Sequence, residues 1–409
     1  MALDLSKDRG TPLDRQRFTW RELVQAPYSK LDDDAFTRVR VILMNGIESE
    51  AVRFQHACAR MNASLQRALA SVRRVEQHQQ TLVNWLNPAD QSPLETTIGF
   101  EQVAIEVTAS VALAEPDPYL AQVYRFGLLE DFDHLYRYGA LYDRLEGKDA
   151  NYLIQGYSDI VPGRPTAVEH RHPDDDLRRP YAREQTELLT KLHAYTIMAA
   201  ENQTHDFYMT IGPMFADPTA RRLYAEIASI EEQHVTQYES IVDPEETWLE
   251  KWLLHEATEA YNYYGCVESE ENPRVKAVWE RLLDYEIGHV RYVADLFQQH
   301  EGRDAAEVLE GRIEPIRYVS HREFVRKTLR AEVQLRARGA EFVEREPPDS
   351  PSLGYREHIN SEGSPSDTVA AGWIWTPGTE LERAAAGNGR RRKGPHSIGR
   401  PKRREERAS

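Results

Sequence analysis

The 409-residue chain contains only two cysteines, Cys58 and Cys266. So few thiols exclude a disulfide framework and an iron site held by four cysteines. Long apolar runs are missing as well, because charged residues interrupt every apolar stretch within a few positions. The N-terminus, MALDLSKDRG, also lacks a basic region followed by an apolar one. We therefore expect a cytoplasmic protein without a membrane span.

Sustained strand-like alternation of apolar and polar residues is absent too, so we expect an all-α protein. Hydrophobic residues make up 40% of the chain, which is enough for two cores. Helical periodicity, bounded by proline, glycine and asparagine, defines two sets of four helices. The first set covers 36–58, 63–86, 94–114 and 118–145, and the second covers 182–211, 218–241, 245–267 and 273–300.

These two sets predict two tandem four-helix bundles, over 36–147 and 182–302. The segment 148–181 is rich in proline, glycine and aspartate and is expected to be a linker. Further helices are expected within 303–345, near 304–311 and 321–339. From 346 to 409 the chain is rich in proline, glycine, serine and arginine, which predicts a disordered tail.

The net charge of −16 is divided unevenly along the chain. From Gly389 onward there are nine lysines or arginines against two glutamates, a local charge of +7, so the rest carries about −23. An acidic body repels nucleic acid, so only the basic tail is expected to attract it.

An internal duplication is visible at an offset of 155 residues. Asp131 with His134 aligns with Glu286 with His289, and both pairs have the spacing of metal ligands on one helix face. The same offset places Glu95 on Glu250, Glu101 on Glu256, Asp117 on Asn272 and Glu146 on Glu301. A slip of one residue, to an offset of 156, places His78 on His234 and Pro88 on Pro244. The chain therefore reads as two related halves.

In the second set, carboxylates and histidines lie inside the apolar stripes of the helices. Each of its four helices contributes to this group, which consists of Glu201, Glu231, His234, Glu256, Glu286 and His289. Unpaired charges in a core are costly, and clustered carboxylates raise one another's pKa values. Two divalent cations would balance four carboxylates and use both imidazoles. This set predicts a dinuclear metal site, with a hydrogen-bonded polar core as the alternative.

The first set looks like an altered copy of that site. Its candidate ligands are Glu48, His78, Glu101, Asp131 and His134. The position that matches Glu231 is Val75, and Glu76 falls on a different face from His78. With fewer carboxylates, this copy would bind one metal, bind it weakly, or bind none.

The second set resembles the ferritin-like di-iron carboxylate superfamily, which includes rubrerythrins and manganese catalases. That family takes one glutamate from each of two helices and a Glu-x-x-His pair from each of the other two. Here the single glutamates are Glu201 and Glu256, and the pairs lie in EEQH and EIGH. Glu259 is similar to the second glutamate on the third helix of rubrerythrins. The family's long crossover is missing, since three residues, 242–244, separate helices two and three, so a simple up-down-up-down bundle is expected.

The resemblance implies two iron or two manganese ions and an oxidoreductase that reacts with O2 or peroxide. No rubredoxin-type module with four cysteines is present, so an external electron donor is expected. Two other functions remain open from the sequence. One is iron handling, as a ferroxidase or a store, and the other is a metal-binding helical scaffold without turnover.

Overall fold

The computed structural model describes residues 3–30, 34–163, 170–311, 313–332, 336–338, 341–343 and 350–373. The expected helical architecture is confirmed. The described strands are β1 (Arg336–Arg338) and β2 (Glu341–Val343), which form a small antiparallel ribbon. The helix expected over 321–339 is therefore shorter than expected, because α13 ends at Glu332 (Arg322–Glu332).

Eight long helices form the body of the molecule. They are α2 (Ala35–Met61), α3 (Gln66–Asn84), α4 (Pro93–Ala114), α5 (Pro118–Glu146), α8 (Leu188–Ile211), α9 (Pro218–Glu239), α10 (Trp248–Ser269) and α11 (Pro273–Glu301). Proline occupies the first turn of α4, α5, α9 and α11, where its missing N–H costs nothing. Gly147 and Gly302 end α5 and α11 with φ of +62° and +71°, a backbone conformation that glycine adopts readily.

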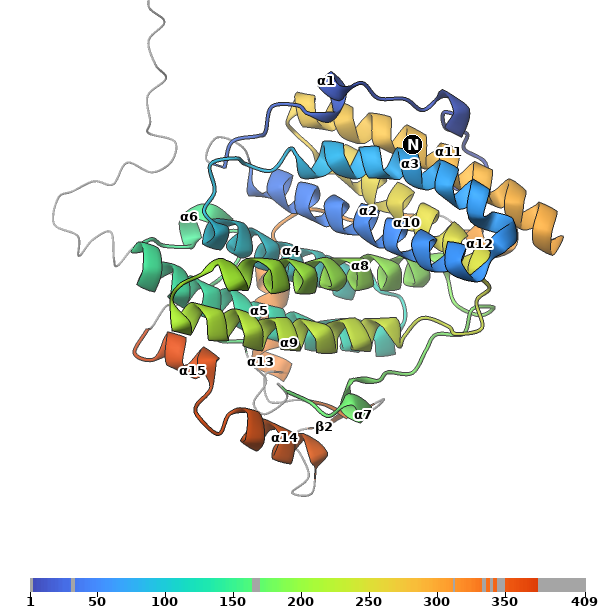
Figure 1. Ribbon diagram of the computed structural model, residues 1–409. Coiled ribbons are helices and arrows are strands. Elements are labelled where there is room, and N and C mark those ends of the chain that lie inside the picture. The colour runs from blue at the N-terminus through green and yellow to red at the C-terminus, as the bar shows by residue number, and fades with distance from the viewer. Residues whose placement is uncertain are drawn as a thin grey trace, which may run out of the picture.

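The eight helices form four hairpins, and these hairpins combine in an order that the sequence did not suggest. Figure 1 shows α4, α5, α8 and α9 together in one half of the molecule, which we call bundle A. It shows α2, α3, α10 and α11 together in the other half, which we call bundle B. The tandem bundles expected over 36–147 and 182–302 are therefore replaced by an interleaved pair. Bundle A is continuous in sequence, and bundle B is made from the two ends of the helical region.

This exchange explains why the connection between α9 and α10 is so short. The segment 240–247 passes from bundle A to bundle B, so α9 and α10 are not successive helices of one bundle. In bundle B, the connection between its two hairpins is the whole of bundle A. The inner helices α2, α4, α8 and α10 also contact one another across the boundary, which joins the two bundles along a common apolar layer.

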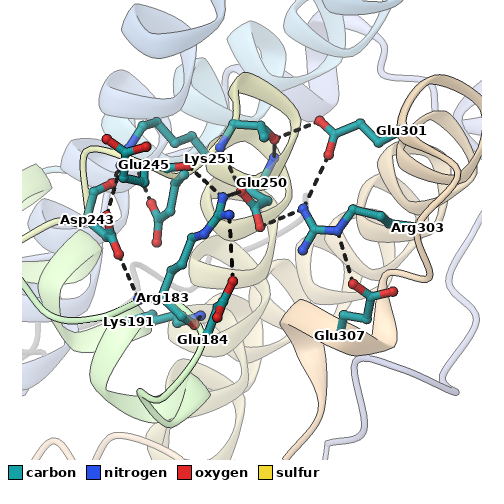
Figure 2. A network of polar contacts seen from close by, with 12 residues as sticks. Arg183, Glu184, Lys191, Asp243, Glu245, Glu250, Lys251, Glu301, Arg303 and Glu307 are labelled. Atoms are coloured by element: carbon teal, nitrogen blue, oxygen red, sulfur yellow. Dashed lines mark hydrogen bonds and ion pairs between the residues drawn. The ribbon is translucent and has the colours of Figure 1, made fainter.

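Ion pairs hold the crossing segment 240–247 in place (Figure 2). The backbone N–H of Arg183, just before α8, donates to Asp243 over 2.8 Å. The guanidinium of Arg183 lies 3.0 Å from Glu250 at the start of α10. Arg303, after the end of α11, reaches the other oxygen of Glu250 over 2.8 Å. Glu250, in the first turn of α10, thus connects the segment before α8 with the segment after α11.

The duplication is also visible in how α4 and α10 begin. Ser92 caps α4 together with Glu95, and its hydroxyl donates to Glu146 over 2.6 Å. Thr247 caps α10 together with Glu250, and its hydroxyl donates to Glu301 over 2.7 Å. All three pairs are related by 155 residues, so the same N-terminal capping box recurs with the same distant partner.

The remaining segments pack on these bundles. They contain the short helices η1 (Leu13–Arg15), α1 (Trp20–Leu23), η2 (Ala63–Leu65), α6 (Asn151–Ile154), α7 (Pro173–Asp176), η3 (Gly212–Met214), α12 (Ala306–Leu309), α14 (Pro351–Ile359) and α15 (Pro365–Ala370). The expected linker at 148–181 is no free spacer, because it buries Arg171 and Asp176.

The expectation of disorder from residue 346 is wrong for residues 350–373. The hydroxyl of Ser366 in α15 donates to Glu226 of α9 over 2.5 Å, and Ser352 in α14 donates to Asp175 over 2.6 Å. The ring of Trp373 lies 5.0 Å from that of Tyr136 on α5. The rest of the expected tail, including its basic end, lies outside the described residues.

Helix α4 is the one helix in the described residues that is long and apolar enough to cross a membrane. Its most apolar window is 89% buried within the structure. That burial is typical of a core helix, and α4 packs against α5, α8 and α2.

We expect Ser92→Ala and Thr247→Ala to destabilise the protein by about 1 kcal/mol each, because each change removes an N-cap and the hydroxyl that holds a distant glutamate. Thermal unfolding followed by far-UV circular dichroism would measure the effect. Ser71→Ala is the control, since that exposed hydroxyl bonds only to a carbonyl of its own helix. Equal unfolding temperatures for all three variants would contradict the role given to the caps.

Candidate metal-binding clusters

Bundle A encloses one group of acidic and histidine side chains, which we call cluster A. Each of its four helices contributes to the group, whose members are Glu101 on α4, Asp131 and His134 on α5, Glu201 on α8, and Glu231 and His234 on α9. All six side chains are almost completely buried. They meet because Glu-x-x-His spacing directs both side chains of a pair to one helix face.

The ligand atoms of cluster A are close enough to share cations. One subset, Asp131, Glu201, Glu231 and His234, brings four such atoms within 4.8 Å of one another, and a second subset joins Glu231 to Glu101 and His134. Glu231 belongs to both subsets. One of its oxygens lies 3.0 Å from His134 Nδ1 and the other lies 3.1 Å from His234 Nδ1. This geometry is that of a carboxylate able to bridge two neighbouring ions.

Burial and mutual repulsion dominate the electrostatics of cluster A. Burial raises the pKa of Glu201 to about 8, and it raises the pKa values of Glu101 and Asp131 well above their usual range, with further increases from neighbouring carboxylates. Burial also acts against ionisation of Glu231, but hydrogen bonds with His134 and His234 hold its pKa well below the usual range. Without a cation, the cluster therefore retains protons that the same groups would lose in water.

The outer nitrogen of His234 is held by residues that the sequence reasoning missed. Its Nε2 lies 2.8 Å from Glu130, and Glu130 accepts two hydrogen bonds of 2.7 and 2.8 Å from Arg171. Burial opposes the charge of Glu130, but Arg171 and His234 lower its pKa to about 2. Arg171 comes from the segment expected to be a linker, where no helical pattern pointed to it. A carboxylate on the outer nitrogen fixes the ring so that Nδ1 faces the other ligands.

Bundle B encloses a second group, which we call cluster B. Its members are Glu48 on α2, Glu76 on α3, Glu256 and Glu259 on α10, and Glu286 and His289 on α11, and all are buried. Glu256 belongs to two close subsets, one with Glu76 and His289 and one with Glu259 and Glu286. His289 Nδ1 lies 3.1 Å from Glu286 and 3.5 Å from Glu256. Cluster B therefore has the same plan as cluster A on the other four helices.

Amide side chains complete cluster B. Gln55 on α2 donates to Glu76 over 2.6 Å, and Gln79 on α3 donates to Glu48 over 3.2 Å and also to Glu286. On the outer side, His289 Nε2 lies 2.6 Å from the side-chain amide oxygen (Oε1) of Gln16, which comes from the N-terminal segment. Sequence periodicity missed these glutamines because neutral amides were not counted as ligands and because Gln16 lies outside the long helices.

The structure separates residues that the sequence had grouped as one site. Glu201, Glu231 and His234 join Glu101, Asp131 and His134 in cluster A, whereas Glu256, Glu259, Glu286 and His289 join Glu48 in cluster B. The expectation of one complete and one degraded site is thereby corrected, because each cluster draws on both halves of the duplication.

His78 and Val75 were misplaced by a slip of one residue. The helix ends keep the offset of 155, since α3 and α9 end at residues 84 and 239 and α4 and α10 begin at 93 and 248. Glu76 therefore corresponds to Glu231, and Gln79 to His234. His78 is in neither cluster, and its ring packs edge-on against Phe18 at 6.0 Å. The matching prolines had favoured the wrong register.

The donor atoms left over in both clusters suit cations. Buried atoms without a hydrogen-bond partner among the described residues include both oxygens of Asp131 and of Glu259, His134 Nε2, and one oxygen each of Glu48, Glu101, Glu201 and Glu256. Buried polar atoms are normally satisfied, so this concentration indicates a missing partner. Carboxylate oxygens with a few imidazoles are donors that iron and manganese accept.

We expect the metal-free protein to lose stability as pH rises from about 4.5 towards 8. The buried carboxyl groups with raised pKa values, Glu48, Glu76, Glu101, Asp131, Glu201 and Glu259, bind more protons in the folded state than in the unfolded state. Their contribution is complete below the unfolded pKa and is lost as pH passes the folded pKa, about 8 for Glu201. Thermal unfolding of chelator-treated protein between pH 5 and 8.5 would measure this slope, and an increase in stability with pH would contradict it.

We expect Arg171→Met to destabilise the protein by about 3 to 5 kcal/mol, because it leaves Glu130 buried without its cation. Adding Glu130→Gln should restore part of that loss, since Arg171 also pairs with the buried Asp176 over 2.6 Å. Arg326→Met is the control, since its ion pair with Asp159 is partly exposed and should be worth about 1 kcal/mol or less. Chemical denaturation monitored by circular dichroism gives the free energy of unfolding of all three variants. Equal losses of stability for Arg171→Met and Arg326→Met would refute the role given to the buried ion pair of Arg171 with Glu130.

Comparisons with protein-family models, with curated proteins and with solved structures found no match to this chain. Functional inference therefore depends on the side-chain geometry of the two clusters.

Proposed function

We propose that the protein is an oxidoreductase whose bundle A holds two iron or two manganese ions that react with O2 or peroxide. The observation that carries this proposal is the position of Glu231, which faces two groups of ligands at once and is flanked by an imidazole on each side. Two adjacent redox-active ions would supply two-electron chemistry at this position.

The charges of cluster A support two divalent ions. Its four carboxylates carry four negative charges when ionised, and two such ions balance them in a core that otherwise forces protons onto the cluster. Asp131, Glu201 and His234 would hold one ion, Glu101 and His134 would hold the other, and Glu231 belongs to both groups. This donor set is the one that the ferritin-like resemblance implies, with an aspartate in place of one glutamate.

The interleaved hairpins also remove an objection to that resemblance. Within each bundle, the two hairpins are joined by a long connection, through 147–187 in bundle A and through all of bundle A in bundle B. A long connection between the second and third helices is what the resemblance implies. The order of helices in a bundle therefore supports a ferritin-like ligand arrangement better than the simple up-down bundle inferred from the sequence.

Two neighbouring tyrosines would serve the chemistry of cluster A. The hydroxyl of Tyr208 donates a hydrogen bond to Glu101 and so orients that carboxylate. The hydroxyl of Tyr238 is buried without a hydrogen-bond partner in the described structure, and it lies against Gly127, where any Cβ would collide with it. Burial and the charge of Glu201 raise the pKa of Tyr238, so this phenol keeps its proton. It can donate that proton to a molecule bound beside the cluster.

The source of electrons would be an external donor. The two cysteines are buried and belong to neither cluster, and burial raises the thiol pKa of Cys58 to about 11 and that of Cys266 to about 12. Neither thiol is therefore suited to deliver electrons at neutral pH.

Metal content and reactivity test the proposal together. We expect protein from iron- or manganese-supplemented cells to contain metal at both clusters. Glu231→Ala should remove most of the metal of cluster A, because it deletes the shared carboxylate, and should lower the rate of peroxide or O2 consumption by at least about 100-fold. Elemental analysis per chain and stopped-flow absorbance would give both values. Glu232→Ala is the matched control, because the neighbouring Glu232 is exposed.

The other outcomes select the other functions. Many irons per chain would favour iron storage or ferroxidase activity. Stoichiometric metal that does not respond to O2 or peroxide would favour a metal-binding scaffold. A metal content near zero in the unmodified protein would refute all three and would leave a hydrogen-bonded polar core.

A further inference from the structure

Clusters A and B occupy equivalent places in their bundles but differ in their nitrogen donors. Gln79 stands where the duplication places His234, so cluster B has His289 alone whereas cluster A has His134 and His234. The amide of Gln79 is used within the cluster, donating to Glu48 and Glu286, and its oxygen has no partner among the described residues. One imidazole has thus been exchanged for an oxygen donor.

The oxygen donors differ in number as well. Glu259 lies one turn beyond Glu256 on α10, is completely buried, and has two oxygens without a hydrogen-bond partner in the described structure. The position 155 residues earlier is Ala104 on α4, which contributes no ligand. Cluster B therefore offers five carboxylates and one imidazole, against four carboxylates and two imidazoles in cluster A.

The support behind the histidines differs in charge. In cluster A the outer nitrogen of His234 faces Glu130, an anion held by Arg171. In cluster B the outer nitrogen of His289 faces Gln16, which is neutral. The Gln16 amide nitrogen donates to the carbonyls of Thr11 and Tyr285 over 2.8 and 2.9 Å, so its oxygen is the atom that accepts from His289. A carboxylate partner makes an imidazole a stronger donor than an amide partner does.

The N-terminal segment is built to hold Gln16 at that place. A Cβ on Gly288 of α11 would collide with the carbonyl oxygen of Thr11, and one on Gly10 would collide with the carbonyl of Asp284. These two glycines let the segment lie against the backbone of α11. Gln16 also lines an open groove of about 1670 Å³ between α3, α11 and the N-terminal segment, so it separates His289 from that groove.

We propose that the two clusters differ in metal preference, with cluster B taking up more Mn²⁺ relative to Fe²⁺ than cluster A does when both ions are offered. Imidazole donors favour iron, whereas carboxylate and carbonyl oxygens favour manganese. Each difference between the clusters, namely the amide at Gln79, the additional Glu259 and the neutral partner Gln16, weakens the preference for iron at cluster B. This proposal rests on the proposed function only in requiring that both clusters bind metal.

The test examines one cluster at a time by removing a carboxylate from the other. Glu231 is shared by both ligand groups of cluster A, and Glu286 forms the Glu-x-x-His pair of cluster B with His289. The Glu231→Ala variant retains cluster B, and the Glu286→Ala variant retains cluster A. Each metal-free variant is incubated anaerobically with equimolar Mn²⁺ and Fe²⁺, desalted, and analysed for both elements, with bound Mn²⁺ also counted by its electron paramagnetic resonance signal. We expect the manganese-to-iron ratio to be at least about tenfold higher in Glu231→Ala than in Glu286→Ala.

Conversion of the differing residues provides the second arm. In the Glu231→Ala background, Gln79→His should lower the manganese-to-iron ratio several-fold, because it gives cluster B an imidazole at the position where cluster A has His234. Glu259→Gln should lower it as well without adding a nitrogen ligand. Gln77→His is the matched control, since Gln77 lies on the same helix but is exposed and should leave the ratio unchanged.

The outcomes separate the two proposals. Metal in both variants at equal manganese-to-iron ratios would overturn the difference in metal preference and leave the proposed function intact. Absence of metal from both variants and from the unmodified protein would refute the proposed function itself. The comparison of Glu231→Ala with Glu286→Ala does not depend on the Gln79→His variant, so a folding defect in that variant leaves the proposal testable.

Discussion

The burial of carboxylates in the cores of the two bundles is the constraint on which the rest of the structure depends. Cluster A and cluster B together place nine carboxylates in contact with apolar helix faces. Burial of even one unpaired charge is expensive, and protonation relieves the cost only in part. The bundles therefore need either retained protons or bound cations. The amide and phenol groups around the clusters, such as Gln55, Tyr208 and Tyr263, satisfy only some of the oxygens.

The interleaving of the hairpins is the arrangement expected if the two halves of a duplicated chain exchange partners. A hairpin such as α8/α9 has one face that requires a complementary pair of helices, and after duplication two equivalent pairs, α4/α5 and α10/α11, were present in one chain. The structure uses α4/α5, which leaves α10/α11 to pair with α2/α3. Both bundles are then complete, and the four inner helices form a shared apolar boundary. The chain is consequently one intertwined unit rather than two separable bundles.

Much of the candidate site could be predicted from the sequence, because the stripe position of a carboxylate determines whether it faces a core. Eleven of the twelve residues predicted as ligands lie in a cluster, and His78 is the exception. The pairing of the hairpins could not be predicted, since periodicity identifies the buried face of a helix but not the hairpin that covers it. The alignment of Glu76 with Glu231 was missed because one histidine and one proline match at an offset of 156, whereas the helix ends, which only the structure shows, keep the offset of 155.

The residues that orient the histidines were the least predictable part. Arg171 lies in a segment without helical periodicity, and Gln16 lies in the N-terminal segment, so neither has a pattern that relates it to a helix face. Glu130 is on a predicted helix, but it is adjacent to Asp131 and appears in sequence only as another acid. Their function depends on contacts over 41 to 273 residues of chain, which only the folded structure specifies.

The two clusters can diverge independently although they lie in one interleaved fold. Each cluster combines one hairpin from each half of the duplication, so a single change such as histidine to glutamine on α3 alters cluster B while α9 keeps His234 for cluster A. The loss of an imidazole at one cluster leaves the fold of both bundles supported by the same boundary of α2, α4, α8 and α10. The partner of each outer histidine nitrogen comes from a different segment: Gln16 from the N-terminal segment for His289, and Glu130 with Arg171 for His234. These partners set the donor strength of each histidine separately. A duplicated scaffold of this kind can therefore keep one ligand geometry while it changes the chemistry of one site.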